Sequence, residues 1–310
     1  MVSEYEIVRV SKESLKDLIP LYKDAFNKAY SLEYLVKKFD TLKFGAEYIG
    51  YIAYHEKKAV ACYVVFPCLM ECNGQEILAA QSGDTMTHQS HRRKGLFVLL
   101  AKKTFELARQ EGIKFLFGFP NDSSYQGFTK NLSWTHEDNM RLYRIKINTL
   151  PLAKLALKSS LFEPLYRFYL KGVLRSYKLT QGAFPFSTAL QGSIHIKYSA
   201  DYTEYKKYGG SFIFKVGGYT IWAKINGVLM IGNIEQKEGN DVLKMVKELK
   251  RLAFITGCTQ ITFSFTKGTY WDKNLNFLTL EEGFKVAYYD LGSALPLSKL
   301  SLSLSALDTF

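Results

Sequence analysis

The chain has 310 residues, 47% of them hydrophobic and 23% charged, which is the balance of a globular protein large enough for two domains. Lys and Arg number 41 against 29 Asp and Glu, so the formal net charge of +12 favours anionic partners. The sequence contains no nucleic-acid motif and no apolar run near the roughly 20 residues of a membrane span. We therefore expect no nucleic-acid partner and no stable membrane insertion. Phosphorylated small molecules remain candidate anionic partners.

The cysteines show no paired spacing of the kind that forms zinc sites or disulfide frameworks; they are Cys62, Cys68, Cys72 and Cys258. Reduced thiols in a cytoplasm are the better interpretation. Residues 1–14 also lack the apolar segment of a secretory signal. The sequence thus predicts a cytoplasmic protein, and it does not indicate an oligomeric state.

The first half of the chain alternates strand and helix patterns. Apolar residues recur at helical spacing in 11–22, in 32–39 and in the helix that carries Phe97, Ala101, Phe105 and Ala108. Strand patterns, separated by turn signals such as Asn73-Gly74, cover 5–10, 48–55, 59–70, 77–88, 113–119 and 141–147, with a short helix at 123–132. This order predicts an α/β (α+β) fold with a mixed, largely antiparallel sheet flanked by helices.

The second half repeats this order after a basic, apolar helical segment at 151–178. Strands are predicted at 192–198, 210–216, 219–225, 228–234 and 260–265, with a helix from Val242 to Ala253 and a turn and closing strand within 280–292. Gly95 and Gly112 recur at nearly the same spacing as Gly239 and Gly257, which indicates an internal duplication in tandem. We expect the 151–178 segment to be a connector packed between domains; its alternative is a helix lying on a membrane surface.

Three consecutive cations, Arg92, Arg93 and Lys94, precede Gly95 where a strand gives way to a helix. The mouth of a helix presents unpaired backbone N–H groups and the positive end of its dipole, which bind phosphate. A glycine lets the backbone approach the anion closely. The sequence therefore predicts an anion site here, although neither GxGxxG nor GxxxxGK[ST] is present.

The loop Arg92-Arg93-Lys94-Gly95-Leu96-Phe97 resembles the pyrophosphate loop of the GNAT superfamily of acyl-CoA-dependent N-acyltransferases, which usually reads Gln/Arg-x-x-Gly-x-Gly/Ala. Arg92 and Gly95 match, whereas Phe97 replaces the final small residue. The stretch "FPNDSSYQGFTKNLSW", 119–134, is similar to the superfamily's strand, Asn and short helix. The resemblance covers roughly residues 4–148.

The resemblance implies a V-shaped opening between two strands that holds the pantetheine arm of acyl-CoA as co-substrate, with no metal. Backbone groups of Met86 and Thr87 would contact that arm, and an N–H near Met86 would polarise the thioester carbonyl. Residues implied to bind the pyrophosphate and the rest of the cofactor are Arg92, Arg93, Lys94, Gly95, Leu96, Phe97, Asn121, Ser124 and Phe128.

The chemistry implied is direct attack of an amine on the thioester, which needs a base to take a proton. Asp84 is the first candidate, because a carboxylate in a mostly apolar cleft has a raised pKa; it could instead orient the acceptor or cap the backbone near Gly83. His88 is the alternative base, and a zinc site at His88 and His91 is disfavoured for lack of further ligands. The thiolate's proton donor is usually a Tyr, but Phe128 stands at that position, so Tyr125 is the substitute.

We expect the second half to be a degenerate GNAT-like domain, because Gln236, Lys237 and Glu238 stand where the first half has its three cations. It would bind no CoA and would contribute Lys267, Tyr270 and Trp271 to the acceptor site. The predicted organisation is a GNAT domain binding acyl-CoA at 1–150, a helical connector at 151–190, a degenerate GNAT-like domain at 191–292 and a tail at 293–310.

Tandem chains of this length, and the segment from Ala29 to Gly45, resemble bacterial enzymes that acylate nucleotide-linked (dTDP- or UDP-) amino sugars for surface polysaccharides. A basic, aromatic-rich protein suits such an anionic acceptor with a flat base. The alternatives are acylation of an aminoglycoside, peptide or aminoacyl amine, or a non-catalytic CoA-binding module. Acetyl-CoA and longer acyl-CoAs are both possible donors.

Overall fold

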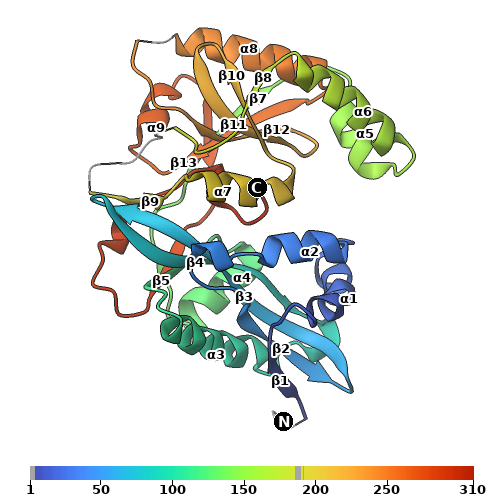
Figure 1. Cartoon of the computed structure of the whole chain (residues 1–310), viewed down its shortest axis with the longest axis vertical. Helices are drawn as coiled ribbons and strands as arrows, with labels where there is room; N and C mark the ends of the chain where they lie inside the picture. The colour runs from blue at the N-terminus through green and yellow to red at the C-terminus, as the bar shows by residue number, and fades with distance from the viewer. Residues whose placement is uncertain (1–3, 186–189, 191, 240) are drawn as a thin grey trace. The chain divides into compact units, whose positions relative to one another are not determined.

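The computed structural model describes residues 4–185, 190, 192–239 and 241–310 (Figure 1). They divide into two compact units. Unit 1 runs to Glu137 and takes in Lys285–Ser298, and unit 2 comprises Asp138–Phe284 and Lys299–Phe310. The chain therefore crosses from one unit to the other more than once.

Unit 1 is built on a mixed sheet whose strands are antiparallel except for one central pair. In spatial order the strands are β1 (Glu6–Arg9), β2 (Ile49–His55), β3 (Lys58–Cys72), β4 (Gln75–Thr87), β5 (Phe115–Gly118), β15 (Ala287–Asp290) and β6 (Thr135–His136). Only β4 and β5 run parallel. The predicted fold class, a largely antiparallel sheet flanked by helices, is confirmed.

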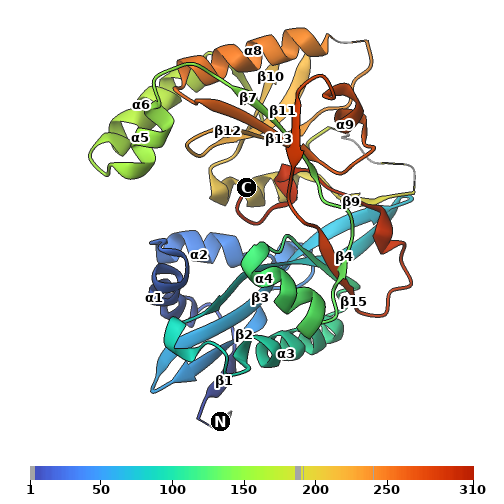
Figure 2. The ribbon, with the colours of Figure 1, turned by 180° about the vertical axis from the view of Figure 1, so that it is seen from behind.

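Helices cover both faces of this sheet, as Figures 1 and 2 show. The helices α1 (Leu15–Phe26) and α2 (Leu32–Phe39) pack against Cys62, Val64 and Phe66 of β3. The helix α3 (Leu96–Gln110) packs on the opposite face, against Tyr63 and Val65. Successive side chains of a strand point to opposite faces, so one apolar strand serves two cores.

The parallel pair of β4 and β5 stops part of the way along β4. Its last paired residues are Ser82 and Gly118, and β4 continues alone on that side to Thr87. Within this extension the register with β3 shifts, and Asp84 adopts a left-handed φ of 48°. The loop after β4 contains a 3₁₀ turn, η2 (Gln89–His91), and leads directly into α3.

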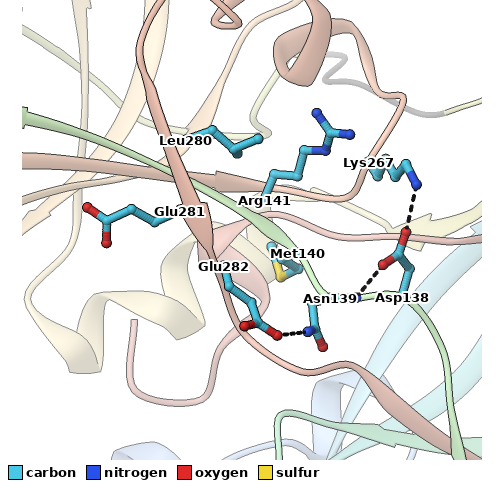
Figure 3. Close-up of a pocket in the computed structure, with 8 residues that line it drawn as sticks. All are labelled: Asp138, Asn139, Met140, Arg141, Lys267, Leu280, Glu281 and Glu282. Carbon is cyan, nitrogen blue, oxygen red and sulfur yellow. Dashed lines mark hydrogen bonds and ion pairs between the residues drawn. The ribbon is translucent and has the colours of Figure 1, made fainter.

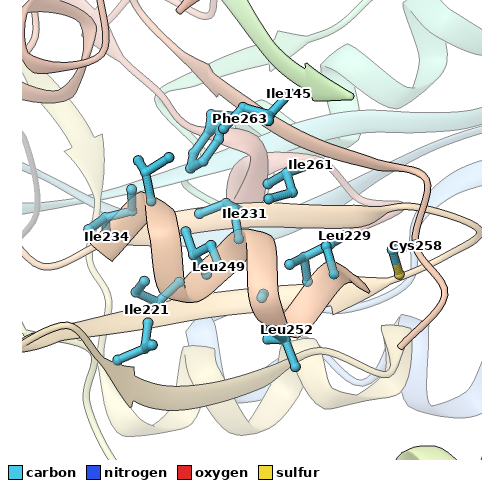
Figure 4. Close-up of a cluster of buried hydrophobic side chains, with 14 of the residues drawn as sticks. Ile145, Ile221, Leu229, Ile231, Ile234, Leu249, Leu252, Cys258, Ile261 and Phe263 are labelled. Atoms are coloured by element: carbon cyan, nitrogen blue, oxygen red, sulfur yellow. The ribbon is translucent and has the colours of Figure 1, made fainter. Parts of the chain in front are cut away.

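Unit 2 repeats this plan with a second sheet. Its strands in spatial order are β14 (Thr279–Glu282), β7 (Arg141–Lys146), β13 (Gln260–Phe265), β12 (Leu229–Ile234), β11 (Tyr219–Ile225), β10 (Phe212–Val216) and β8 (Lys178–Thr180). Again one pair, β12 with β13, is parallel. Helix α8 (Val242–Ile255) places Leu249 and Leu252 on the apolar face of these strands (Figure 4).

Smaller elements complete both units. In unit 1, α4 (Asp122–Gln126) and the π-turn η3 (Gly127–Asn131) follow β5, and η1 (Leu42–Phe44) follows α2. In unit 2 the helices are α5 (Leu152–Lys158), α6 (Phe162–Arg175), α7 (Ala200–Tyr205) and α9 (Tyr270–Asn274), and β9 (Ile194–Ile196) pairs with β16 (Leu300–Ser301). In the described part of the chain, every helix is too short or too polar to cross a membrane.

Two predicted strands lie in the other half's sheet. The strand predicted at 141–147 is β7, which pairs with β13 and β14 in unit 2 instead of closing the first half. The closing strand of the second half is β15, which pairs with β5 in unit 1. The boundaries at 150 and 292 are therefore corrected, because strand pairing is decided by partners distant in the sequence.

The segment predicted as a connector belongs to unit 2, and the predicted tail is divided: residues 293–298 belong to unit 1 and residues 299–310 to unit 2. Helices α5 and α6 bury Ala153, Ala156 and Tyr166 in its core, while Leu161 and Phe168 stay exposed. Residues 186–189 of the predicted connector lie outside the described residues. The predicted tail is ordered, and Phe310 is fully buried.

Candidate functional site

The basic loop between β4 and α3 has the geometry of an anion site. Arg93 and Gly95 both adopt left-handed conformations, with φ of 63° and 80°. Gly95 is the N-cap residue of α3 and offers no side chain to the helix N-terminus. The first-turn N–H groups of α3 therefore lack a side-chain cap, beside three exposed cations.

Two of these cations also have contacts within unit 1. The Nε of Arg92 donates to the Thr87 carbonyl at 3.2 Å, which ties the loop to the end of β4. The Nζ of Lys94 lies 3.7 Å from Glu4 Oε1 and 5.8 Å from the centre of the Tyr5 ring. Its hydrogen bond to Tyr5, with help from Glu4, raises the pKa of Lys94, so this ammonium is charged at neutral pH.

The side chains of Leu96 and Phe97 face the core and not the loop. Leu96 is buried under the sheet, and the Phe97 ring packs against Phe128 and Tyr63. A Cβ on Gly127 would stand 3.0 Å from the Phe97 ring, so this contact is tight. Only the backbone groups of Leu96 and Phe97 remain at the helix mouth, and the Phe97 ring does not narrow it.

The extension of β4 pairs with β3 but not with β5, and it contains a buried polar group without a partner among the described residues. The Thr85 hydroxyl is buried and makes no hydrogen bond among the described residues. Met86 is buried against α1 and α2, and the Thr87 carbonyl accepts from Arg92. An orphaned polar atom beside an unpaired strand end fits a ligand that brings hydrogen-bonding groups, as the pantetheine arm does.

Asp84 is not surrounded by the apolar cleft that the sequence suggested. Its Oδ2 accepts from the Tyr22 hydroxyl at 2.5 Å and lies 2.6 Å from the Lys38 Nζ. The Lys38 and Asp84 side chains are only 1% and 8% exposed. A buried carboxylate with an ammonium at contact distance is stabilised as the anion, which opposes the raised pKa that a base in an apolar cleft would have.

The pKa values of two groups beside the Lys38–Asp84 pair are raised. Burial, followed by the charge of Asp84, raises the pKa of Tyr22 far above its ordinary value. Burial, again with Asp84, raises the pKa of the Cys62 thiol. The Lys38 ammonium also lies 4.8 Å from the centre of the Phe66 ring, which favours a cation. Tyr22 and Asp84 are therefore a donor and an acceptor in fixed roles.

Sequence reasoning missed Lys38 and Tyr22 as parts of this site. Lys38 stands beside Phe39 and three residues after Leu35, both buried in the core of α2. A lysine at such a position is a signal, because a buried ammonium requires an anionic partner. The sequence pattern alone could not identify Asp84 as this anionic partner, because Asp84 lies 46 residues further along the chain.

The His88 side chain contacts Ser90 and Asp24. Its Nδ1 accepts from the Ser90 backbone N–H at 3.3 Å, and its Nε2 lies 3.6 Å from Asp24 Oδ2. His91 accepts from the Tyr5 hydroxyl at 2.9 Å, and burial together with Lys94 lowers its pKa. Among the residues that the structure describes, no group of His, Cys, Asp and Glu has the arrangement of a metal site.

Tyr125 belongs to a small polar cluster at the start of α4. Its hydroxyl lies 3.0 Å from His136 Nδ1, and the Lys285 Nζ lies 5.6 Å from its ring centre. Lys285 also pairs with Asp122 at 2.5 Å. The Tyr125 hydroxyl therefore has a partner that can exchange a proton with it.

Asn121 caps α4. Its side chain accepts from the Ser124 backbone N–H at 3.0 Å and from the Ser124 hydroxyl at 3.1 Å. Phe128 is buried, and its ring contacts Trp134 edge to face. Of the residues predicted to bind the cofactor, Asn121 is thus an N-cap, Ser124 is its hydrogen-bond donor and Phe128 is a core ring.

The three residues of unit 2 that were predicted to bind the acceptor lie in different environments. Trp271 is fully buried, and its Nε1 donates to the Ile234 carbonyl at 2.9 Å, so it presents no surface to a substrate and that prediction is wrong. The Tyr270 hydroxyl donates to the Lys237 carbonyl at 3.3 Å. Lys267 is exposed and lies 3.4 Å from Asp138.

Lys267 lines an open pocket of about 410 Å³ in unit 2 (Figure 3). Carboxylates outnumber cations along its wall, which is formed by Asp138, Asn139, Met140, Arg141, Lys267, Leu280, Glu281 and Glu282. Asn139 donates to Glu282 at 2.5 Å, and Arg141 lies 3.6 Å from the buried Asp272. The pocket therefore has an excess of carboxylates, and several of its polar side chains already have hydrogen-bond or ion-pair partners.

Comparison with known proteins finds one family model that matches part of the chain. Residues 6–136 match the family model described as an acetyltransferase (GNAT) domain. No curated protein sequence matches the chain. The match covers β1 to β6 and thus contains the basic loop, the bulged extension of β4 and the Asp84 cluster.

Solved structures share the fold over most of the chain. A probable N-acyltransferase of unknown function from Enterococcus faecalis V583 has a TM-score of 0.60 at 10% identity, over 93% of this chain and 73% of its own. A GCN5-related N-acetyltransferase from Kribbella flavida has a TM-score of 0.53 at 10% identity, over 92% and 70%. A putative acetyltransferase from Pyrococcus horikoshii has a TM-score of 0.52 at 11% identity, over 98% and 94%.

Proposed function

We propose that the chain is an acyl-CoA-dependent N-acyltransferase, since residues 6–136 match the GNAT acetyltransferase domain, and that its acceptor is the primary amine of a nucleotide-linked amino sugar. One observation carries the donor half of this proposal. An uncapped helix N-terminus, two left-handed residues and three exposed cations converge directly beyond a strand end that has no partner on one side.

The chain's own residues would act on the donor in two places. The N–H groups at the mouth of α3 and the side chains of Arg92 and Arg93 hold the pyrophosphate. The backbone between Asp84 and Thr87 faces the pantetheine arm and the thioester carbonyl. Acyl-CoA supplies an activated acyl group, and the attacking amine forms the new amide as the thiolate leaves.

Support for a nucleotide-linked acceptor comes from charge and from aromatic side chains. The net charge of +12 suits a diphosphate. Tyr30, between α1 and α2, stacks on Tyr34 of α2 at 4.4 Å with planes 10° apart, and the Tyr22 ring of α1 meets Tyr30 edge to face at 5.1 Å. Tyr30 and Tyr34 are half-buried and thus leave ring surface for a flat base.

One feature favours a second class of acceptor. The pocket of unit 2 has more carboxylates than cations, which suits a polycationic amine such as an aminoglycoside. The two acceptors differ in charge, so one screen separates them.

We infer that unit 2 binds no CoA, because its own residues stand where the donor would be held. Helix α8 corresponds to α3, but its N-cap is Asp241, whose carboxylate accepts from the Lys244 backbone N–H at 3.0 Å. An anion already at this helix mouth, with Glu238 nearby in sequence, repels a second one.

The parallel strand pair of unit 2 is also filled by the chain. Pairing of β12 with β13 ends at Ile231 and Phe263. The 3₁₀ turn η6 (Leu304–Ala306) contacts both strands. The Phe310 ring lies against Gly232, where a Cβ would stand 2.1 Å from it. Residues 302–310 thus lie along the strands that would hold the pantetheine arm.

Calorimetry of CoA binding tests the donor site. Arg92→Ala/Arg93→Ala should weaken binding at least tenfold, since each charged contact contributes about 1.5–3 kcal/mol. Lys237→Ala, the matching position of unit 2, should leave binding unchanged, and the stoichiometry should be one CoA per chain. Unchanged affinity in the arginine variant would contradict the loop assignment, and two CoA per chain would contradict the silent second half.

A thiol-release screen tests the acceptor. Acetyl-CoA and longer acyl-CoAs are offered with dTDP- and UDP-linked amino sugars, aminoglycosides and amino-terminal peptides. Turnover with a nucleotide-linked amino sugar and none with the free sugar supports the proposal. Turnover confined to aminoglycosides assigns the acceptor to the acidic pocket instead.

A further inference from the structure

Asp84 stands at a strained point in the middle of a long strand. Its φ of 48° lies in the left-handed region, which costs a non-glycine residue free energy and persists only where the surroundings hold it. The register of β3 against β4 shifts at the same place, between Cys62 and Val64. A bulge of this kind leaves backbone groups outside the ladder.

Two helices hold the side chain of this strained residue. Tyr22 of α1 donates to Asp84 Oδ2 at 2.5 Å, and Lys38 of α2 lies 2.6 Å from the same oxygen. Tyr22 and Lys38 are almost completely buried, so a substrate cannot reach either of them. Other groups near this pair include the buried Cys62 thiol on β3 and the Phe66 ring beside the ammonium.

We propose that Lys38 and Tyr22 are positioning residues that clamp Asp84, and through it hold the bulged backbone from Asp84 to Met86 toward the thioester carbonyl. This inference rests on the proposed function, because it assumes that acyl-CoA lies beside β4. It assigns Asp84 a conformational role instead of proton abstraction.

The surroundings support this role over that of a base. A base accepts a proton on a free electron pair, but Asp84 Oδ2 is already engaged by an ammonium and a hydroxyl. The neighbouring Thr85 hydroxyl is buried without a partner among the described residues, so polar groups of this bulge are prepared for a ligand. The clamp fixes the backbone that carries them.

The α2 helix offers a matched pair of variants. Lys38→Met removes the clamp's cation, whereas Lys37→Met removes the adjacent, exposed lysine that pairs only with Glu33 in the i,i+4 position. Asp84→Asn keeps an oxygen acceptor for Tyr22 and a side chain that tolerates the left-handed region, yet it cannot act as a base. Tyr22→Phe loosens the clamp without leaving a buried charge unpaired.

The experiment measures kcat, CoA affinity by calorimetry, and the infrared carbonyl band of bound acetyl-CoA labelled with ¹³C at the acetyl carbonyl. Lys38→Met should lower kcat about 100-fold, the order of one lost carbonyl donor. Its CoA affinity should stay within twofold, and its carbonyl band should return to the value of free acetyl-CoA. Asp84→Asn removes the anion of the same ion pair, so it should lose the polarised band together with kcat, as Lys38→Met does, and Lys37→Met should match the wild type.

The inference is overturned if Lys38→Met keeps the polarised carbonyl, or if Asp84→Asn loses activity as a base variant would while its band is unchanged. If Lys38→Met does not fold, Tyr22→Phe carries the test, with an expected partial return of the band and about a tenfold loss of kcat. A wild-type protein that binds no CoA refutes the proposed function itself. A wild type that binds CoA and polarises its carbonyl, with all variants unaffected, refutes only the clamp.

Discussion

The ring of Phe97 packs edge to face against the ring of Phe128, with centroids 5.6 Å apart and planes at 70°. Phe97 stands where the GNAT pattern has a small residue in the loop. Phe128 stands where that pattern has a tyrosine on the short helix. Both rings also contact Tyr63 on β3. The two departures are therefore one packing feature, in which a core contact replaces a small loop residue and a hydroxyl.

Phe97→Ala should destabilise the protein by about 2–4 kcal/mol, because it empties a packed aromatic site. CoA affinity should change little, since the ring faces the core and the helix mouth keeps its N–H groups. Chemical unfolding and calorimetry measure the two quantities. A large gain in CoA affinity would show that the ring does restrict the loop.

Phe128→Tyr tests whether a hydroxyl at the family's position restores a proton donor. Phe128 is 6% exposed and ringed by Tyr63, Phe97 and Trp134, so a new hydroxyl without a partner should cost about 1–3 kcal/mol. We expect no increase in kcat, whereas Tyr125→Phe should reduce it. A rise in kcat for Phe128→Tyr would show that the thiolate passes close to this ring.

The stability of the protein should fall with acidification through His91. Burial, followed by Lys94 and the neighbouring His55 and His88, lowers the pKa of His91 below its ordinary value of 6.5. The unfolded chain then binds more protons near and below pH 6.5, so stability is full above that pH and is lost as the pH falls toward the folded pKa. His91→Gln should flatten this dependence in unfolding experiments between pH 7 and 5; parallel curves would contradict it.

The cysteines should resist modification in the native state. All four are free and buried, and burial raises the pKa of Cys62 and raises that of Cys258 to about 11. A thiol-specific reagent at pH 8 should label the native protein slowly and the unfolded protein at four sites. Rapid labelling under native conditions would indicate that a thiol is exposed.

Gly232 and Phe310 should behave as a coupled pair in unit 2. Phe310→Ala should cost about 3–5 kcal/mol of stability, since the ring is fully buried against Gly232 and Trp222. Gly232→Ala should also be costly, because its Cβ would overlap the ring. The double variant should be more stable than the sum of the single effects predicts, and additive values would contradict the contact.

Much of the local structure could be predicted from the sequence. The helix α3, its glycine N-cap and the strands before and after it follow from apolar spacing and turn residues, and the basic loop lies where the pattern placed it. The near-continuous apolar run of β3 is typical of a strand that is buried on both faces. These features depend on residues close together in the chain, where periodicity carries the information.

The Asp84 cluster and the pairing of β7 and β15 could not be predicted in the same way. Tyr22 and Asp84 are 62 residues apart, and only the packing of α1 against β3 and β4 brings them together. Trp271 comes shortly after the end of a strand, a position that predicts an exposed loop, yet its ring fills the core of unit 2. Which distant element buries a residue is decided by the whole fold.

The placement of β15 beside β5 has a consequence for synthesis on the ribosome. The sheet of unit 1 cannot be completed until Ala287–Asp290 has been made, although Phe115–Gly118 is translated far earlier. At about 5–20 residues per second, the edge of β5 waits roughly 10–30 seconds for its partner. During that interval the nascent first half exposes an apolar strand edge, so its solubility in the cell depends on how fast the second half is translated.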